Sequence, residues 1–273
     1  MPKASDSPTP AVLRRATGAV SASAAARHDD PLGARQREDS RGARQRAVAD
    51  ARRALVLDAA RAAFFELGLE GASMREIARR AGYTPGAIYS YFASKEEVYG
   101  ALLGESLERL NAQVATATAA AVAAAAGRPA ALAEPARSIA GLRASASAFF
   151  EFYREHPRDL DLGFYLFQGM QPRGLTPALN ERLNARLSDA LVPTQAALQR
   201  LGVEPAAAQA EVTALFAHIV GLLLLSHTGR IRMFKQESQG LFNAYLDALV
   251  ARAGAARLAS APLARRRRTR SGV

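Results

Sequence analysis

Residues 73–98 contain three helix starts in quick succession and carry groups able to bind a polyanion. Residues 73–76 (Ser-Met-Arg-Glu) and 94–97 (Ser-Lys-Glu-Glu) both have the spacing of a capping box, in which the serine hydroxyl accepts an amide N–H and the glutamate reaches back to the cap. Thr84 predicts a third start, of a short helix over 85–92, because the proline after it suits the first helical position. Gly82 suits the left-handed end of the helix before it. Two short helices joined by a tight glycine turn predict a helix-turn-helix, whose second helix enters the major groove of DNA.

Several side chains in this segment are chemically suited to DNA. Arg75 lies in the first turn of the first short helix, where its guanidinium can bond guanine O6 and N7, or a phosphate. Ser73 stands at a helix N-terminus, whose free amides favour an anion. Gly86 and Ala87 are small, so the second helix can approach the bases closely. The large apolar side chains are assigned to the core of the domain: Ile77, Ile88 and Phe92.

The region at residues 48–104 resembles the DNA-binding domain of TetR-family (TetR/AcrR) transcriptional regulators. Three runs carry the resemblance in unbroken order and spacing. They are Ala-Phe-Phe-Glu-Leu-Gly at 63–68, Gly-Ala-Ser-Met-Arg-Glu-Ile-Ala at 71–78, and Ala-Gly-Tyr-Thr-Pro-Gly-Ala-Ile-Tyr-Ser-Tyr-Phe-Ala-Ser-Lys-Glu at 81–96. The rest of the chain matches the family only in architecture, as an all-helical C-terminal domain.

The resemblance implies a set of DNA contacts. The expected DNA-binding residues are Ser73, Arg75, Tyr83, Thr84, Pro85, Gly86, Ala87, Tyr89, Ser90, Tyr91 and Lys95. Among them Tyr89 and Tyr91 correspond to phosphate-contacting aromatic positions, and Lys95 to a phosphate anchor. Alternatives stay open, because Tyr89 can instead pack the core, and Ser73 and Thr84 can serve as caps only.

Two positions depart from the family pattern. Position 83 is often a small aliphatic residue in the family and is Tyr83 here, while position 85 is often a long polar residue and is Pro85 here. Few long donors therefore remain on the reading helix. We expect sequence choice to depend on van der Waals contacts, on DNA shape, and on the side chains of Arg75, Tyr83, Thr84 and Ser90.

Helical periodicity runs through nearly the whole chain between its tails, which predicts an all-α protein. We expect an N-terminal three-helix helix-turn-helix domain and a larger helical ligand-binding and dimerisation domain. The first helix has an apolar stripe that stops at Gly68: Val56, Ala59, Ala60, Ala63, Phe64 and Leu67. Further helices are expected at about 95–126, 137–156, 159–170, 176–201, 205–228 and 235–253. Breaks between them are expected at Gly127/Pro129, Pro135, His156-Pro157, Pro172, Gly202/Pro205 and Gly229.

The net charge of +11 lies almost entirely in the tails. Residues 1–46 carry nine basic and five acidic side chains, residues 256–273 carry six basic and no acidic ones, and residues 47–104 are neutral overall. Because the tails hold few large apolar residues, both are predicted to be disordered. The expected organisation is a disordered basic arm at 1–46, the helix-turn-helix domain at 47–98, the helical ligand-binding and dimerisation domain at 99–255, and an Arg-rich tail at 256–273.

Aromatic residues cluster at 149–167. The resemblance implies that they form the wall of a pocket for a small apolar or aromatic effector. The candidate pocket residues are Phe149, Phe150, Tyr153, Phe164, Tyr165, Phe167, Met170 and His218. The other interpretation is an ordinary core, because the helical period places several of them on one face. For His218, a core histidine is the favoured interpretation.

The last two long helices, at about 211–226 and 234–250, suit a dimer interface. The first is apolar nearly all round at 219–225, so it must be buried on more than one side. The resemblance implies that two such helices from each subunit form the four-helix interface of a homodimer. That dimer would present two recognition helices to half-sites about one turn (~34–36 Å) apart on a near-palindromic operator. The alternative is burial of the apolar helix within its own domain.

Other classes of protein are disfavoured. The chain has no cysteine, which excludes disulfides, cysteine nucleophiles and thiolate zinc sites. It has no glycine-rich phosphate loop, nucleophile elbow or metal-spaced His–carboxylate pair, so no catalytic residue, metal or cofactor is expected. The longest apolar run, at 214–226, is shorter than the ~18–20 residues of a membrane span. The stretch after Arg14-Arg15 is too polar for an export signal, which predicts a cytoplasmic protein that does not act at a membrane.

The sequence therefore predicts a DNA-binding transcriptional regulator, a ligand-responsive repressor that binds a near-palindromic double-stranded operator as a homodimer. An activator of the same family is one alternative. Another is nucleoid or membrane-surface binding through the basic tails, which would be blind to DNA sequence and would disappear when both tails are cut.

Overall fold

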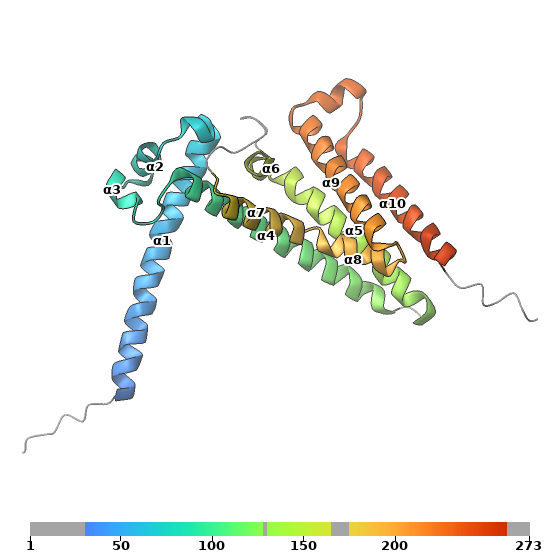
Figure 1. Cartoon of the computed structure of the whole chain (residues 1–273), viewed down its shortest axis with the longest axis horizontal. Helices are drawn as coiled ribbons and strands as arrows, with labels where there is room; N and C mark the ends of the chain where they lie inside the picture. Colours follow the sequence, from blue (N-terminus) through green and yellow to red (C-terminus); the bar gives the residue numbers. More distant parts are fainter. Residues whose placement is uncertain (1–30, 128–129, 165–174, 261–273) are drawn as a thin grey trace, which may run out of the picture. The chain divides into compact units, whose positions relative to one another are not determined.

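The computed structural model describes residues 31–127, 130–164 and 175–260, and all regular structure in these ranges is helical (Figure 1). The all-α prediction is confirmed. The chain divides into two units, residues 1–49 and residues 50–273.

In the first unit, the described part is the beginning of α1 (Pro31–Gly71). The prediction of a disordered arm is therefore wrong for residues 31–46, and residues 1–30 lie outside the described part. Alanine, arginine and glutamine dominate this stretch and have high helix propensity, and no proline follows Pro31 within α1. Most side chains near the end of the unit are exposed, so this part of α1 forms from local propensity rather than from packing.

In the second unit, α1 continues into a small domain with α2 (Met74–Ala81) and α3 (Pro85–Ile88). Regular helical geometry is interrupted at Gly68, whose φ is 73°, and this is the residue at which the apolar stripe was predicted to stop. The predicted stripe is buried at Val56, Ala60, Ala63 and Phe64 and half-buried at Ala59. Leu67 was expected in the stripe but is 45% exposed, because it precedes the kink and lies beside Gly71 instead of facing the core.

The larger part of this unit contains the remaining helices. They are α4 (Lys95–Ala124), η1 (Ala125–Gly127), α5 (Ala130–Glu155), α6 (Pro157–Phe164), α7 (Pro177–Asp189), α8 (Val192–Arg200), α9 (Pro205–His227), η2 (Arg230–Phe234) and α10 (Ser238–Ser260). The long helices α4 and α5 pack along each other, α7 lies on α4, and α8 lies on α5 (Figure 1). Helices α9 and α10 pair with each other, and both contact α5.

Two predicted boundaries in this region are wrong. Helix α5 runs through Pro135, because a proline near its start removes one backbone hydrogen bond without ending the helix. The single helix expected at 176–201 is two helices that meet at Ala190–Leu191, where the new start accommodates Pro193. The helix expected at 159–170 is described only to Phe164.

Helix α7 approaches α4 where α4 has glycines. A Cβ atom on Gly100 would lie 2.7 Å from Leu179 Cδ2, and one on Gly104 would lie 3.0 Å from Arg186 Nη1. Arg186 also pairs with Glu108 at 2.8 Å. The two glycines therefore allow α7 to sit close on α4.

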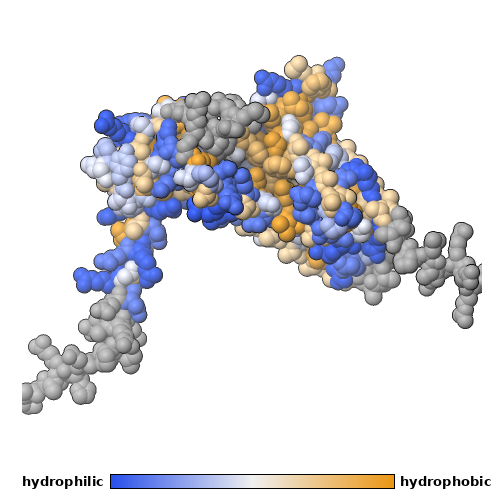
Figure 2. Space-filling view, viewed as in Figure 1, coloured by the Kyte–Doolittle hydropathy of each residue, from blue (hydrophilic) through white to orange (hydrophobic). Residues whose placement is uncertain are grey.

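Helix α9 is long and apolar enough to cross a bilayer, by length and composition alone. The apolar run at 214–226 did not predict a helix of this length, because the alanine-rich turns before the run extend it to Pro205. Five larger side chains of α9 are buried in the core: Val212, Leu215, Ile219, Leu222 and Leu223. Figure 2 shows hydrophobic residues gathered over the part of the molecule that contains α9.

Candidate nucleic-acid interface

Helix α2 begins at the predicted cap. Ser73 has extended backbone angles, and its Oγ accepts the N–H of Glu76 at 3.2 Å. The Glu76 carboxylate accepts hydrogen bonds from Arg79 at 2.7 and 2.9 Å and from Arg80 at 2.7 Å, instead of returning to the cap as a capping box would. Because both guanidinium groups stabilise the carboxylate, the pKa of Glu76 falls to about 2. The capping role of Ser73 is confirmed, and a phosphate contact remains a prediction.

An ion-pair bridge fixes α2 on α1. Arg80 pairs with Glu66 of α1 at 2.8 Å and with Glu76 of its own helix at 2.7 Å, and hydrogen bonding to Arg80 lowers the pKa of Glu66. This bridge was not predicted from the sequence. The i, i+4 spacing of Glu76 and Arg80 signals half of it, but the contact with Glu66 depends on the packing of two helices.

The turn after α2 has the predicted glycine geometry. Gly82 has φ 73° and ψ 25°, which is the left-handed conformation. Its N–H donates to the Arg79 carbonyl at 3.3 Å, and the N–H of Tyr83 donates to the Ala78 carbonyl at 2.9 Å. These two bonds satisfy carbonyls at the end of α2 and set the direction of the chain into α3.

Helix α3 begins where predicted but ends early. Thr84 Oγ1 accepts the N–H of Ala87 at 3.3 Å, and the α-helix ends at Ile88 instead of continuing to Phe92 as expected. Ser90 Oγ donates to the Ala87 carbonyl at 2.7 Å, and such a side-chain bond competes with regular helical bonding. The chain then turns, with Phe92 N–H bonded to the Ile88 carbonyl at 3.1 Å. Both of these apolar side chains are buried, as predicted.

The predicted contact residues differ in accessibility. Those that are exposed are Ser73, Arg75, Thr84, Pro85, Gly86, Tyr89 and Ser90. Those that are half-buried are Tyr83, Ala87, Tyr91 and Lys95. Tyr89 is 54% exposed, so the structure does not support the alternative that it packs the core. Tyr83 and Tyr91 pack against the core, and their ring centroids lie 6.4 Å apart.

Three features of this surface suit close approach by a polyanion. Arg75 is exposed, and no carboxylate in the described part of the chain forms an ion pair with it. A Cβ atom placed on Gly86 would meet no other atom within 4 Å, so α3 presents bare backbone at this point. Lys95 Nζ donates to the Leu69 carbonyl at 3.0 Å, which joins the start of α4 to the end of α1. The proposed phosphate anchor therefore also has a structural contact.

Some of the predicted effector-pocket residues belong to the core, and others line a cavity. Phe149 and Phe150 are completely buried, and Phe150 stacks on Phe242 with centroids 4.3 Å apart, which supports the core interpretation for both. His218 stacks on Tyr245 at 4.2 Å, and burial lowers its pKa. Three other predicted pocket residues lie outside the described part: Tyr165, Phe167 and Met170.

A hollow lies between α4, α6 and α7, and we name it the inner hollow. Its lining includes two of the predicted effector-pocket residues. Tyr153 and Phe164 line it, with ring centroids 5.8 Å apart, and its volume including the mouth is about 380 Å³. The other lining residues are Leu103, Leu107, Gly163, Asn180, Leu183, Asn184 and Leu187. Burial and the nearby charge of Asp159 raise the pKa of Tyr153, so its hydroxyl remains neutral. The inner hollow is thus an apolar cavity with a phenol and two amides as polar groups.

Within residues 31–127, 130–164 and 175–260, no cluster of three or more histidine or acidic side chains could hold a metal ion. The described part of the chain thus offers a protein surface suited to DNA and a small apolar cavity.

Comparison with known proteins adds relatives for the small domain. A profile described as "Bacterial regulatory proteins, tetR family" matches residues 56–102. The A-factor receptor protein of Streptomyces griseus is 46% identical over 50 residues, 18% of each chain. The transcriptional repressor KstR2 of Mycobacterium tuberculosis is 42% identical over 64 residues, 23% of this chain and 32% of the relative. The match thus spans a third or less of the length of these two curated relatives.

Solved structures extend the likeness in fold to most of the chain. Regulatory protein SCO4313 superposes with a TM-score of 0.59 at 19% identity, covering 76% of this chain and 98% of that one. A tetR-family regulatory protein from Rhodococcus RHA1 gives 0.54 at 17% identity, covering 74% and 97%. The SmeT–triclosan complex gives 0.50 at 21% identity, covering 72% and 91%.

Proposed function

Because the chain belongs to the tetR family of bacterial regulatory proteins, we propose that it is a sequence-specific DNA-binding regulator that represses transcription from a near-palindromic operator. The observation that carries this proposal is the surface of α2 and α3. Caps at Ser73 and Thr84, the left-handed turn at Gly82 and the buried anchors Ile88 and Phe92 hold a short, small-residue helix outward. KstR2, a repressor by name, shares the matched segment and supports repression over activation.

Each proposed DNA contact has a chemical role. Arg75 would bond a guanine edge or a phosphate, and the exposed hydroxyl of Tyr89 would bond a phosphate. The bare backbone at Gly86 would let α3 lie deep in the major groove. The small domain is electrically neutral overall, so specific affinity would come from these placed donors rather than from net charge.

Selection of bound duplexes from a random library tests this proposal, and the selected duplex then serves for variants. We expect Arg75→Ala to lose about 1–3 kcal/mol of binding at each half-site. The matched control is Arg182→Ala, which removes an exposed arginine from α7. Enrichment of no sequence, or equal affinity of both variants and the parent protein, would contradict operator recognition through this surface.

We further propose that α9 and α10 form the interface of a homodimer. The side chains that these helices leave exposed are mostly small: Ala210, Thr213, Ala214, Ala217 and Gly221 on α9, and Gly240, Ala244, Ala248 and Ala251 on α10. Arg252 pairs with Glu211 at 2.7 and 3.0 Å, which holds the two helices together as one surface. Small residues allow the helices of a second copy to approach closely. Two recognition helices would then face two half-sites.

The inner hollow is the proposed effector site. Its lining of leucine and aromatic side chains suits an apolar or aromatic molecule, and the Tyr153 hydroxyl can orient one polar group of that molecule. The structural neighbour SmeT is in a complex with triclosan, which supports a small-molecule site in this fold. An effector that binds the DNA-free protein more tightly than the operator-bound protein would weaken operator binding by the difference between these two binding free energies, typically about 1–3 kcal/mol. Replacement of Leu183 by Phe would fill the cavity and should remove this response while operator binding persists.

The same proposal places the protein in the cytoplasm as a regulator without catalytic activity. The competing function, sequence-blind binding through the basic tails, makes a different prediction. Removal of residues 1–46 and 256–273 would abolish this sequence-blind binding, whereas sequence-specific binding through α2 and α3 would keep the same ranking of selected operators. Loss of all binding in that truncated protein would favour the competing function.

A further inference from the structure

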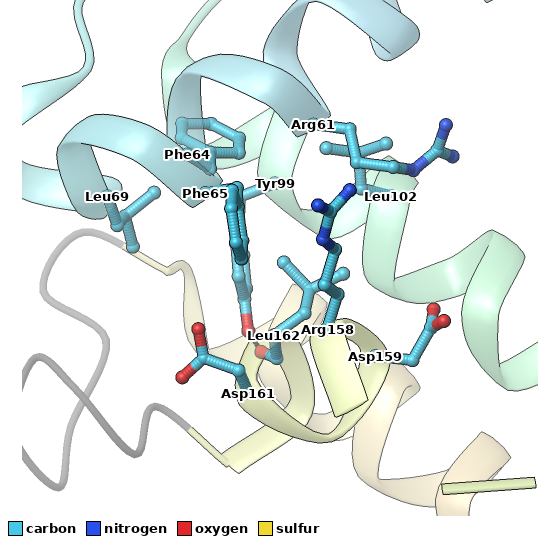
Figure 3. A pocket seen from close by; sticks show the side chains of 10 residues that line it. All are labelled: Arg61, Phe64, Phe65, Leu69, Tyr99, Leu102, Arg158, Asp159, Asp161 and Leu162. Carbon is cyan, nitrogen blue, oxygen red and sulfur yellow. Dashed lines mark hydrogen bonds between the residues drawn. The ribbon is translucent and has the colours of Figure 1, made fainter. Parts of the chain in front are cut away.

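A second hollow lies where the end of α1, the start of α4 and α6 meet, and we name it the junction hollow (Figure 3). Its volume including the mouth is about 670 Å³. The floor is apolar and consists of Phe64, Leu69, Tyr99, Leu102 and Leu162. The Tyr99 hydroxyl donates to the Leu162 carbonyl, so the polar atom of the tyrosine is already bonded and its ring belongs to the apolar floor.

One wall of the junction hollow is an arginine stacked on an exposed phenylalanine. The Arg158 guanidinium carbon lies 4.0 Å from the centroid of the Phe65 ring, and the two side chains stand face to face in Figure 3. Phe65 is 56% exposed, which is costly for so large an apolar side chain. Arg158 is itself exposed, and the stacking on Phe65 holds its guanidinium beside the hollow.

The charged groups around the hollow differ in their partners. Arg61 pairs with Asp58 at 2.6 Å and with Glu105 at 3.3 Å, and Asp159 pairs with Arg109 at 2.6 Å. Among the residues that the structure describes, no carboxylate forms an ion pair with Arg158.

Asp161, the remaining charged residue of the lining, lies on the far side of Phe65 from the guanidinium (Figure 3). The hollow therefore combines an apolar floor with one guanidinium that no carboxylate of the described residues pairs with.

From this arrangement we propose that the junction hollow binds a small amphipathic carboxylate. The apolar end would lie on the floor between Phe64 and Leu162, and the carboxylate would pair with Arg158. A guanidinium presents two parallel N–H donors that match the two oxygens of a carboxylate. The apolar area of the floor favours a hydrocarbon chain or ring over a sugar or a nucleotide.

This site is separate from the inner hollow, and α6 lies between the two. Leu162 lines the junction hollow, whereas the next two residues, Gly163 and Phe164, line the inner hollow. Arg158 also joins α6 to α1 through Phe65, so an anion that draws the guanidinium away would change this connection. Binding is measured without DNA, so its outcome is independent of the proposed operator recognition.

The chain has no tryptophan, which allows a clean optical probe. In Phe65→Trp the single indole keeps an aromatic face beneath Arg158 and reports on the junction hollow. We expect its fluorescence to saturate with octanoate, and octanoate to bind roughly 10- to 100-fold more tightly than octanamide, because hydrogen bonds to a charged group exceed those to a neutral one.

Substitutions in the Phe65→Trp protein locate the charge. Arg158→Gln should remove the preference for octanoate over octanamide, and Arg158→Lys should keep part of it. The matched control Arg200→Gln, on the exposed end of α8, should leave both affinities unchanged. Equal binding of the acid and the amide, or an unchanged preference in Arg158→Gln, would overturn the proposal.

A second pair of variants locates the apolar end. Leu162→Phe should fill the junction hollow and weaken octanoate about tenfold or more, whereas Leu187→Phe, which lines only the inner hollow, should not. The reverse result would place octanoate in the inner hollow and refute the assignment. Far-UV circular dichroism checks that each variant is folded. If Leu162→Phe is unfolded, Leu102→Met takes its place, because it reshapes the same floor at similar volume. We then expect a several-fold loss of octanoate affinity.

Discussion

Replacement of Gly86 by leucine separates protein stability from DNA recognition. Gly86 lies in α3 with an ordinary backbone conformation, and a Cβ atom on it would meet no other atom within 4 Å. A new side chain at this position therefore points to solvent, or to DNA when DNA is bound, and not to another part of the protein. Helix stability should rise, because glycine is less favourable than other residues in a helix by about 0.5–1 kcal/mol. The melting temperature should then stay the same or rise by about 1–4 °C.

The effect on DNA should have the opposite sign. If α3 packs against base edges, an added side chain overfills the contact, and overpacking typically costs about 1–3 kcal/mol. A homodimer carries the change at both half-sites, so operator binding should lose about 2–6 kcal/mol. This range corresponds to a factor of about 30 to about 10⁴ in Kd.

Fluorescence anisotropy with the selected duplex at fixed salt measures this effect, because salt alone changes such affinities strongly. Ala185→Leu is the matched control, since it adds a similar side chain to an exposed position of α7. If Gly86→Leu melts at or above the parent temperature and still binds the operator with parent affinity, α3 is not the reading helix.

Three further outcomes are expected. Gly221→Arg adds a charge to the exposed face of α9 without an internal clash, so light scattering should show monomers of unchanged helicity, and persistent dimers would contradict the α9–α10 interface. The pKa of Glu76 is about 2 against an ordinary 4.5, so the stabilising contribution of its carboxylate is complete above pH 4.5 and is lost as the pH falls towards 2. Glu76→Gln should therefore flatten the dependence of melting temperature on pH between 4.5 and 2. An unchanged slope would refute the stabilising role of Arg79 and Arg80. Phe150→Ala should cost about 3–5 kcal/mol of unfolding free energy in denaturant titration, because it empties a buried stack on Phe242; a loss below 1 kcal/mol would mean that the stack is not part of the core.

Local signals in the sequence predicted the small domain well. The caps at Ser73, Thr84 and Ser94 each receive the expected amide bond, and Gly82 adopts the expected left-handed turn. Glu97 also reaches back towards the cap, since its carboxylate accepts the N–H of Ala93, the residue before Ser94, at 2.9 Å. These features depend on residues three or four positions apart, so a single sequence contains them.

Features that depend on packing between distant segments were not predictable. The pairing of Arg80 with Glu66, and of Arg158 with Phe65, requires knowledge of which helix faces meet. The division of the aromatic cluster between core and cavity was not predictable for the same reason. Periodicity shows that Phe150 is on an apolar face, but it does not show whether that face meets a helix or a cavity. The split between α7 and α8 shows a third limit, since one helical pattern can continue across two helices.

The buried phenol of Tyr153 makes the inner hollow vulnerable to alkali. An unfolded tyrosine ionises near pH 10, whereas Tyr153 resists ionisation in the folded chain, so each unit of pH above 10 favours the unfolded state. In an ultraviolet titration, the phenolate absorbance step of Tyr153 should come above pH 10 and should coincide with the loss of helix. The residue that gives the cavity its phenol thus also makes the folded chain sensitive to alkali.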